Sequence, residues 1–380
     1  MQLFKPTTLS AAILTASMSA AHADVNVVAS IKPVHSLVAG VMQGVGTPSL
    51  IIEGAGSPHS YALKPSQARQ LQNADLVFWM SHDLEAFLEK SIEGIAANAT
   101  AIALADSHGI KKLAFREGGA FDAHDHDDHD DHDDHDDHDD HDDHGHDEHE
   151  EHGHDEHDDH GHDDHDEHEE HGHDEHDEHG HDDHDEHEEH GHDEHDEQGH
   201  DNHDEHDHGE FDPHVWLDPI NAKAMVHEIE EALSAADPAN AAAYEANAEK
   251  MMGDLDNLVA EITADLAPVK DKGFIVFHDA YQYFENRFGI SAAGSITVSP
   301  DVMPGAQRIR ELQEKVNSLG GACVFSEPQF EPKLVSTVTE STNAGTGVLD
   351  PLGASIDNGP ELYFTLIRNM SYSIKDCLTD

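Results

Sequence analysis

The chain has 380 residues, and its 82 acidic side chains outnumber the 19 lysines and arginines, giving a formal net charge of −63 at pH 7. So large a negative charge excludes nucleic acid and anionic lipid surfaces as partners, and it concentrates cations around the protein. Residues 122–210 hold 31 histidines and 47 aspartates and glutamates without one lysine or arginine, so most of the acidity belongs to this single insert. The remaining residues are numerous enough to form two hydrophobic cores of ordinary size.

The first 23 residues are typical of a secretory signal peptide. Lys5 supplies a positive start, an apolar stretch follows over 11–16, and the small residues Ala21 and Ala23 lie where a signal peptidase cuts. We therefore expect cleavage after Ala23 and export to the periplasm as a soluble protein. The alternative is a buried N-terminal helix, since the apolar stretch is too short to cross a bilayer.

Between this leader and the insert, short apolar strands alternate with helical patterns. Strands are predicted over 25–30, 50–52, 74–79 and 101–104, and helices over 33–42, 65–73 and 83–95. The strands are apolar on both faces, which is typical of a parallel sheet covered by helices on both sides. This part of the sequence therefore predicts an α/β lobe.

The insert at 122–210 is a low-complexity segment built from two repeats. Asp-Asp-His recurs every third residue from His126 to His144, and Glu-Glu-His-Gly then recurs with a period of 19 residues. Neither repeat contains an apolar residue to bury. We therefore expect a disordered, solvated loop instead of a repeat fold.

After the insert, residues 221–234 follow an amphipathic helical pattern. Asp237 then offers an N-cap with Pro238 at the first helical position, and apolar residues recur at helical spacing until Pro268. The spacing predicts one helix over 238–267, roughly 45 Å long at about 1.5 Å per residue. Such a helix is long enough to join two lobes.

The alternation of strands and helices restarts after this helix. Strands are predicted over 273–277, 322–325 and 347–349, and helices over 280–288, 305–318, 334–342 and 361–377. The fold class is therefore α/β, with two lobes of parallel sheet joined by one long rigid linker helix. The expected domains are a first lobe at 24–237 that includes the insert, the linker helix at 238–268 and a second lobe at 269–380. Binding sites in such sheets lie in the crevice beyond the carboxyl ends of the strands.

Four side chains outside the insert lie where a ligand of such a crevice belongs. His59 follows an apolar strand, His214 lies between the insert and a helix, and His278 and Asp350 each end a strand. Taken singly, each has a structural explanation, because a strand-end histidine is commonly hydrogen-bonded and an aspartate before proline commonly forms a turn. Their coincidence, two at the mouth of each lobe, predicts a binding site between the lobes.

The two cysteines, Cys323 and Cys377, lie 54 positions apart without further cysteines near them. In an exported protein such a pair is expected to form one disulfide bond, tying the last helix to a core strand. The alternative is a pair of metal ligands.

Six blocks of sequence, in order, carry a resemblance to a known family. They are 58–66 (PHSYALKPS), 71–77 (LQNADLV), 214–219 (HVWLDP), 276–281 (VFHDAY), 323–330 (CVFSEPQF) and 349–353 (LDPLG). In these blocks the chain resembles the periplasmic zinc-binding component of high-affinity zinc ABC importers, within the metal-binding cluster A-I of solute-binding proteins. The resemblance covers essentially all of the mature chain apart from the length and detail of the insert.

This resemblance implies two pseudo-related (βα)₄ lobes joined by one long helix, with a metal site in the cleft between them. It carries the ligand roles onto His59, His214 and His278, with Asp350 or a water as the fourth ligand. The manganese branch commonly has glutamate where this chain has His278, and a third neutral imidazole favours Zn²⁺. Glu327 is expected to support the site, with a ligand role as the alternative. The remaining histidines outside the leader and the insert are expected not to bind metal: His35, His82, His108 and His227.

The resemblance also implies the function. The protein is expected to capture Zn²⁺ in the periplasm as a transported ligand, as a monomer without enzymatic activity, and to deliver it to a membrane permease served by a cytoplasmic ATPase. One rival is a zinc hydrolase, since three histidines and a water also form a catalytic shell; the sequence contains no His-Glu-x-x-His motif. The other rival is a periplasmic metal buffer that serves no transporter.

The insert predicts a second, weaker zinc system, because its imidazoles lie beside carboxylates on a flexible chain. Many overlapping pairs and triples of ligands can bind there without one fixed geometry. We expect the loop to gather or buffer zinc; the alternative is a solvated acidic loop with incidental metal affinity. The candidate loop ligands are His126, His129, His132, His144, His152, His171, His190, His206 and His208.

Overall fold

The structure, a computed structural model, describes residues 25–116, 121, 211–297, 303–320 and 322–379. The signal peptide and the insert at 122–210 lie outside these residues. Cleavage after Ala23 and the disorder of the insert therefore stay predictions. The described residues of both lobes belong to one compact unit.

The first lobe is built on a parallel sheet of four strands in the order β2-β1-β3-β4. Its strands are β1 (Val27–Ala29), β2 (Ser49–Leu50), β3 (Leu76–Trp79) and β4 (Thr100–Ala103), with the helices α1 (Lys32–Val41), α2 (Pro65–Gln72) and α3 (Ala86–Ile95). The central strands β1 and β3 are buried along their whole length, as their apolar sequences require. The predicted α/β lobe is confirmed, with ends shifted by a few residues.

The second lobe repeats this topology with the order β6-β5-β7-β8. Its elements are β5 (Phe274–His278), α6 (Gln282–Phe288), β6 (Ala292–Thr297), α7 (Ala306–Ser318), β7 (Cys323–Ser326), α8 (Lys333–Thr339), β8 (Gly345–Val348) and α9 (Leu362–Thr379). In both lobes the first strand in sequence is an inner strand, which places its carboxyl end beside that of the third. The strand β6 was not predicted, because its sequence AAGSIT contains only one large apolar residue.

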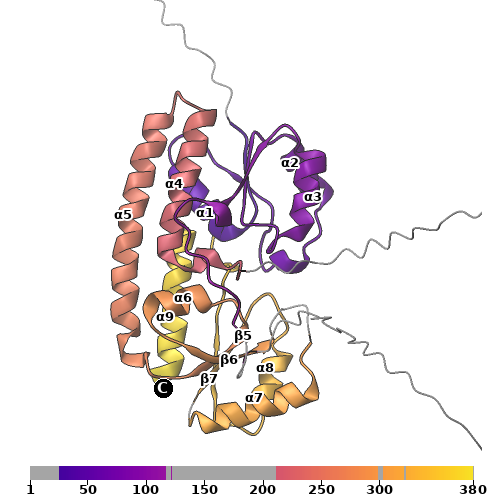
Figure 1. Cartoon of the computed structure of the whole chain (residues 1–380), viewed down its shortest axis with the longest axis vertical. Helices are drawn as coiled ribbons and strands as arrows, with labels where there is room; N and C mark the ends of the chain where they lie inside the picture. Colours follow the sequence, from indigo (N-terminus) through magenta and orange to yellow (C-terminus); the bar gives the residue numbers. More distant parts are fainter. Residues whose placement is uncertain (1–24, 117–120, 122–210, 298–302, 321, 380) are drawn as a thin grey trace, which may run out of the picture. The chain divides into compact units, whose positions relative to one another are not determined.

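Two long antiparallel helices connect the lobes: α4 (Pro219–Ala236) and α5 (Ala241–Leu266). In Figure 1, α5 runs beside α4, and it packs against α1 of the first lobe and α6 and α9 of the second. At about 1.5 Å per residue its 26 residues span about 39 Å. The linker helix predicted from the sequence is therefore present.

The predicted start of the linker helix is wrong. Its N-cap is Asn240, and Asp237 instead ends α4. The Asp237 carboxylate accepts hydrogen bonds from Asn240 Nδ2 at 2.6 Å and from the Tyr244 hydroxyl at 3.0 Å. The Asp-Pro pair therefore makes the turn between two helices and does not begin the second one.

The two lobes share a hydrophobic core. One continuous cluster of buried apolar side chains includes residues of β1 and β3, of α5, and of β5 and α9. A separate small cluster, formed by residues such as Phe277 and Leu312, covers the other face of the second sheet. Short 3-10 turns complete the framework: η1 (Pro58–Ser60), η2 (Leu104–Asp106), η3 (Val215–Leu217) and η4 (Ala267–Val269).

Cys323 of β7 and Cys377 of α9 form a disulfide bond, with an S–S distance of 2.05 Å. This confirms the predicted disulfide and leaves neither sulfur free as a thiolate for a metal. The bond fixes the end of α9 to the second sheet, while the start of α9 contacts the first lobe through Tyr363.

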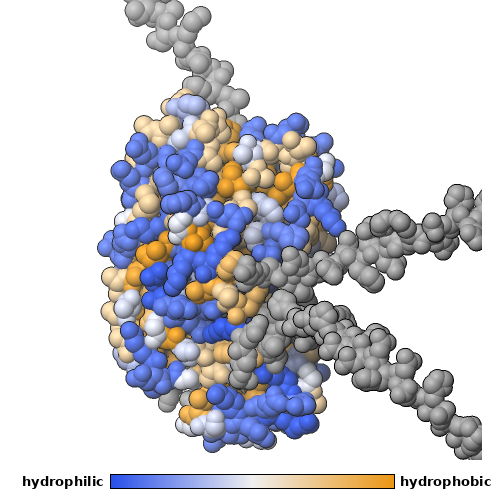
Figure 2. Space-filling view, viewed as in Figure 1, coloured by the Kyte–Doolittle hydropathy of each residue, from blue (hydrophilic) through white to orange (hydrophobic). Residues whose placement is uncertain are grey.

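On the face seen in Figure 2, hydrophilic side chains cover both lobes, with apolar side chains between them in small groups. The large apolar side chains exposed in the described part of the chain are Ile95, Met303, Val348 and Tyr372. Among the described helices, none combines the length and the apolar character that crossing a membrane demands.

Candidate metal centre

His59 reaches the site from a loop that leaves the first sheet after β2. Gly54 turns this loop with a φ of +65°, a conformation that glycine adopts without strain. Pro58 then begins the single turn η1, which carries His59 in its middle. His59 as a whole residue is partly exposed, unlike His214 and His278, so this side of the site lies nearer to solvent.

His214 caps the short turn η3, directly before the buried residues Val215 and Trp216. Asp212 accepts hydrogen bonds from both the backbone N–H of His214, at 3.0 Å, and its Nδ1, at 2.7 Å. Because a carboxylate only accepts, the proton of the neutral ring lies on Nδ1 and Nε2 is left with a bare lone pair.

His278 is the last residue of β5, and Glu327 directly follows the neighbouring strand β7. The carboxyl ends of parallel neighbours meet at one edge, which explains why residues 49 positions apart touch. Glu327 Oε1 lies 2.7 Å from His278 Nδ1. The same argument places the proton of the neutral ring on Nδ1 and leaves Nε2 of His278 bare. Glu327 therefore orients a proposed ligand, which is the supporting role predicted for it.

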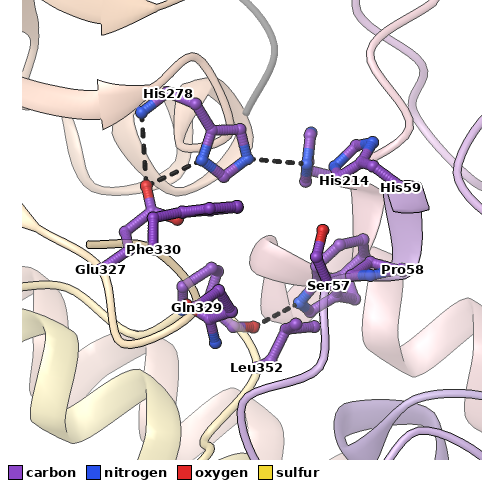
Figure 3. Close-up of a pocket in the computed structure, with 11 residues that line it drawn as sticks. Ser57, Pro58, His59, His214, His278, Glu327, Gln329, Phe330 and Leu352 are labelled. Carbon is purple, nitrogen blue, oxygen red and sulfur yellow. Dashed lines mark hydrogen bonds and ion pairs between the residues drawn. The ribbon is translucent and has the colours of Figure 1, made fainter. Parts of the chain in front are cut away.

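The three histidines converge on one point (Figure 3). One potential ligand atom of each lies within 4.8 Å of those of the other two. His214 Nε2 and His278 Nε2 are 3.3 Å apart. Two nitrogens that bind one tetrahedral zinc ion at about 2.0–2.1 Å are also separated by about 3.3 Å. Two bare lone pairs at this distance repel each other unless a cation lies between them.

The pocket around these rings is small and mostly apolar. Its free volume is ≈ 10 Å³, about enough for one ion or one water. Trp216 and Phe330 form part of its wall, and Trp216 Nε1 donates to the carbonyl of Pro351 in the second lobe at 2.9 Å. The pocket therefore suits a single small cation and excludes an organic ligand.

Burial and the neighbouring charges act differently on the histidines. Burial lowers the pKa of His59 well below its ordinary value, and the nearby His214 and His278 lower it further. For His278, burial lowers the pKa, but the charge and hydrogen bond of Glu327, together with the charges of Asp279 and Asp212, raise it on balance. A ring such as His59, which stays neutral at physiological pH, is ready to bind a metal.

Asp350 lies near the pocket but is not a member of the three-histidine group. Its Oδ1 accepts from the backbone N–H groups of Leu352, at 3.2 Å, and Gly353, at 2.9 Å, and its Oδ2 accepts from that of Ala354, at 2.6 Å. Gln329 Nε2 also donates to Oδ1. The carboxylate therefore caps the loop after β8, and its role as a ligand stays a prediction.

The other candidates from the sequence lie elsewhere. None of His35, His82, His108 and His227 belongs to the group of potential ligands among the described residues. The loop candidates lie outside the described residues: His126, His129, His132, His144, His152, His171, His190, His206 and His208. Sequence reasoning did not identify Asp212 or Gln329, although Asp212 lies only two residues before a predicted ligand.

Comparisons with known proteins identify the family of this chain. The model of the family ZnuA, described as zinc-uptake complex component A periplasmic, matches residues 27–377. The high-affinity zinc uptake system protein ZnuA of Brucella suis biovar 1 (strain 1330) is 51% identical over 353 residues, covering 93% of this chain and 91% of that protein.

Solved structures show the same fold. A crystal structure of ZnuA has a TM-score of 0.63 and 19% identity, and the match covers 94% of this chain and 100% of that chain. A ZnuA deletion mutant with zinc bound has a TM-score of 0.62 and 19% identity, and the match covers 93% of this chain and 98% of that one.

Proposed function

The chain belongs to the ZnuA family of periplasmic zinc-uptake components, and from that premise we propose that it captures Zn²⁺ between its lobes and delivers it to an ABC importer. The observation that carries this proposal is the pair of bare imidazole nitrogens 3.3 Å apart, with a third histidine beside them. The ligands are His59, His214 and His278, completed by Asp350 or a water. Three neutral nitrogen ligands favour zinc over a harder ion such as Mn²⁺.

The remaining parts of the proposal follow from the family. The protein acts in the periplasm after cleavage of its signal peptide at Ala23, as a monomer, and its partners are a membrane permease and the cytoplasmic ATPase of that permease. It releases its metal unchanged and is not an enzyme. The first lobe, 24–237, contributes His59 and His214, and the second lobe, 269–380, contributes His278 to the same ion. The linker helix α5 (Ala241–Leu266) joins the two lobes.

The insert at 122–210 serves the same ion in a second way. Its 31 histidines bind zinc weakly and exchange it among themselves. The first described residues after the insert, Phe211 and Asp212, lead directly to His214. Zinc held on the loop is therefore released close to the tight site, which increases the local concentration when zinc is scarce.

Calorimetric titration with zinc, in the presence of a competing chelator, tests the ligand set. We expect one tight site in the parent chain, and a loss of affinity of at least about 100-fold in His59→Ala and in His278→Ala, because each removes a direct ligand. His227→Ala is the matched control, since this exposed histidine of α4 is remote from the group. Parent-like affinity in the first two variants would show that the ligand set is wrong.

Deletion of 122–210 tests the role of the loop. We expect the extra, weak zinc equivalents to disappear while one tight equivalent stays. If the tight equivalent disappears as well, the loop supplies a primary ligand and the proposed division of labour is wrong. Growth of an importer-deficient cell in scarce zinc, restored by this chain together with its permease, separates a transport component from a metal buffer.

A further inference from the structure

Gln329 is a polar residue that lines the metal pocket but has no role in the proposed set of ligands. It lies two residues after Glu327 and lines the same pocket as His59, His214 and His278 (Figure 3). Its Oε1 is buried and accepts no hydrogen bond from any described residue. A buried acceptor without a donor is costly, so we expect a donor to reach it when the site is filled.

Asp350 fixes which way this amide faces. Gln329 Nε2 donates to Asp350 Oδ1 at 3.0 Å. Because a carboxylate only accepts, the nitrogen end of the amide faces Asp350 and Oε1 points away from it. Asp350 is in turn held by three backbone N–H groups of its own loop. The amide oxygen is therefore presented in one fixed orientation.

The chemistry of the pocket limits what the donor is. The imidazoles offer bare nitrogens to a cation, and the free volume of ≈ 10 Å³ leaves no room for an organic group. Three histidines fill three positions of a tetrahedral ion and leave one open. A water in that position directs a lone pair at the ion and keeps its hydrogens for acceptors such as an amide oxygen.

On the basis of the proposed zinc site, we propose that Gln329, oriented by Asp350, accepts a hydrogen bond from the water that completes the coordination of zinc. Asp350 is then a positioning residue and not a ligand. The arrangement also determines selectivity, because it holds a neutral acceptor where a carboxylate would attract Mn²⁺, which prefers anionic oxygen ligands.

The test measures zinc and manganese affinities of the full chain by chelator competition, with one equivalent of metal so that the tight site fills first. Gln329→Leu has a similar size but no acceptor, and we expect zinc affinity to fall by about 10–100-fold. Gln329→Glu supplies an anionic oxygen, and we expect the preference for zinc over manganese to fall by at least about tenfold. Gln307→Glu, the same change at an exposed position of α7, is expected to alter neither affinity.

A double-mutant cycle separates a positioning role of Asp350 from direct ligation. If Asp350 acts through Gln329, Asp350→Asn weakens zinc binding in the parent but adds little in the Gln329→Leu background. Equal losses in both backgrounds, or parent-like affinity and selectivity in the Gln329 variants, would overturn this inference. Absence of a tight zinc site in the parent chain would instead overturn the proposed function, so the two failures are distinguishable.

Discussion

Two buried carboxylates prepare the histidine rings for metal. Asp212 and Glu327 each lie 2.7 Å from the Nδ1 of a proposed ligand, and each side chain is 1% exposed. They fix the ring orientation and keep the proton on the nitrogen that faces away from the ion. Loss of such partners typically lowers metal affinity by about 10–100-fold.

Replacement of these carboxylates is therefore expected to weaken zinc binding without abolishing it. Asp212→Asn and Glu327→Gln keep the size of each side chain but remove its charge, and we expect a loss of about 10–100-fold in zinc affinity. Chelator competition measures this loss. Asp75→Asn is the control, because the Asp75 carboxylate accepts a hydrogen bond from Asn26 and does not line the metal pocket. Unchanged affinity in both site variants would contradict the orienting role.

Glu85 is a second kind of buried carboxyl group, located in the first lobe after β3. It is fully buried, Oε2 accepts from the backbone N–H of Met80 at 2.7 Å, and Oε1 has no partner among the described residues. Burial raises its pKa from 4.5 to about 7, and the hydrogen bond from the backbone of Met80 opposes this effect only in part.

This shift predicts a dependence of stability on pH. The folded state holds the proton of Glu85 more tightly than the unfolded state does. The contribution of Glu85 to the free energy of unfolding is therefore fully present below pH 4.5 and is lost as the pH rises through about 7. The loss is on the order of 3 kcal/mol in the free energy of unfolding. Glu85→Gln stays neutral throughout, so its stability relative to the parent is expected to increase between pH 5 and pH 8. Urea unfolding of the metal-free proteins checks this, and a constant difference between the two would contradict it.

Single residues of the site were predictable to different degrees. The three histidines were predicted as ligands from their positions at the mouths of the lobes and from the resemblance that the surrounding blocks carry, because both are visible in local sequence. The supporting role of Glu327 was predicted, but its contact with His278 depends on which strands become neighbours. Asp212 and Gln329 were not predicted. The partner of Asp212 is only two residues away, whereas Gln329 meets Asp350 because β7 and β8 are neighbours. Asp350 shows the same limit: its position after β8 was predicted, but its hydrogen bonds with the following loop were not.

At the scale of elements, a short segment just before the insert, residues 111–116, contacts the second lobe. It has no regular secondary structure, yet Leu113 N donates to Tyr283 of α6, and an isolated antiparallel bridge pairs Ala114 with Phe211. Arg116 of this segment binds two carboxylates, Asp279 next to His278 and Glu285 of α6. The described residues on either side of the insert, 113–116 and 211, are therefore paired with each other and attached to the second lobe.

Removal of this guanidinium is expected to be destabilising. Arg116→Met leaves Asp279 and Glu285, whose side chains are 6% and 5% exposed, without their cation. The expected loss in the free energy of unfolding is about 3–5 kcal/mol. Lys223→Met, which removes a more exposed ion pair between α4 and α5, is expected to cost less than about 1 kcal/mol. Equal effects of the two substitutions in urea unfolding would contradict this ranking.

The elements themselves were largely predictable because apolar runs and helical spacing are strong local signals. The exceptions have physical reasons. The strand β6 consists mostly of small residues, and its hydrogen bonds with β5 determine its conformation more than its own side chains do. The start of α5 was misplaced because an Asp-Pro pair is compatible both with a helix start and with a turn between helices.

At the scale of the whole molecule, the lobes are joined by more than the linker helix. The Tyr363 hydroxyl donates to the carbonyl of Trp216 at 2.7 Å, and Ser36 Oγ donates to that of Gly359 at 2.8 Å. Lys32 Nζ donates to the carbonyl of Ile356 at 2.6 Å. Together with the shared hydrophobic core, these contacts oppose a wide hinge motion.

We therefore expect zinc binding to tilt the lobes only slightly. Spin labels at Glu93→Cys on α3 and Glu314→Cys on α7 report the separation of the lobes, since both positions are exposed helical residues. Pulsed electron paramagnetic resonance measures the distance between the two labels, and we expect zinc to change this distance by no more than about 2 Å. A large change in separation, of the kind that hinge-bending proteins show, would contradict a rigid connection.

The central claim is that histidines from both lobes meet on one zinc ion. A crystal structure of the chain with one equivalent of zinc, with anomalous differences recorded at the zinc absorption edge, tests it most directly. We expect one strong peak at about 2.0–2.1 Å from a ring nitrogen of each of His59, His214 and His278. A fully occupied zinc ion that leaves two of these three rings uncoordinated would contradict the account.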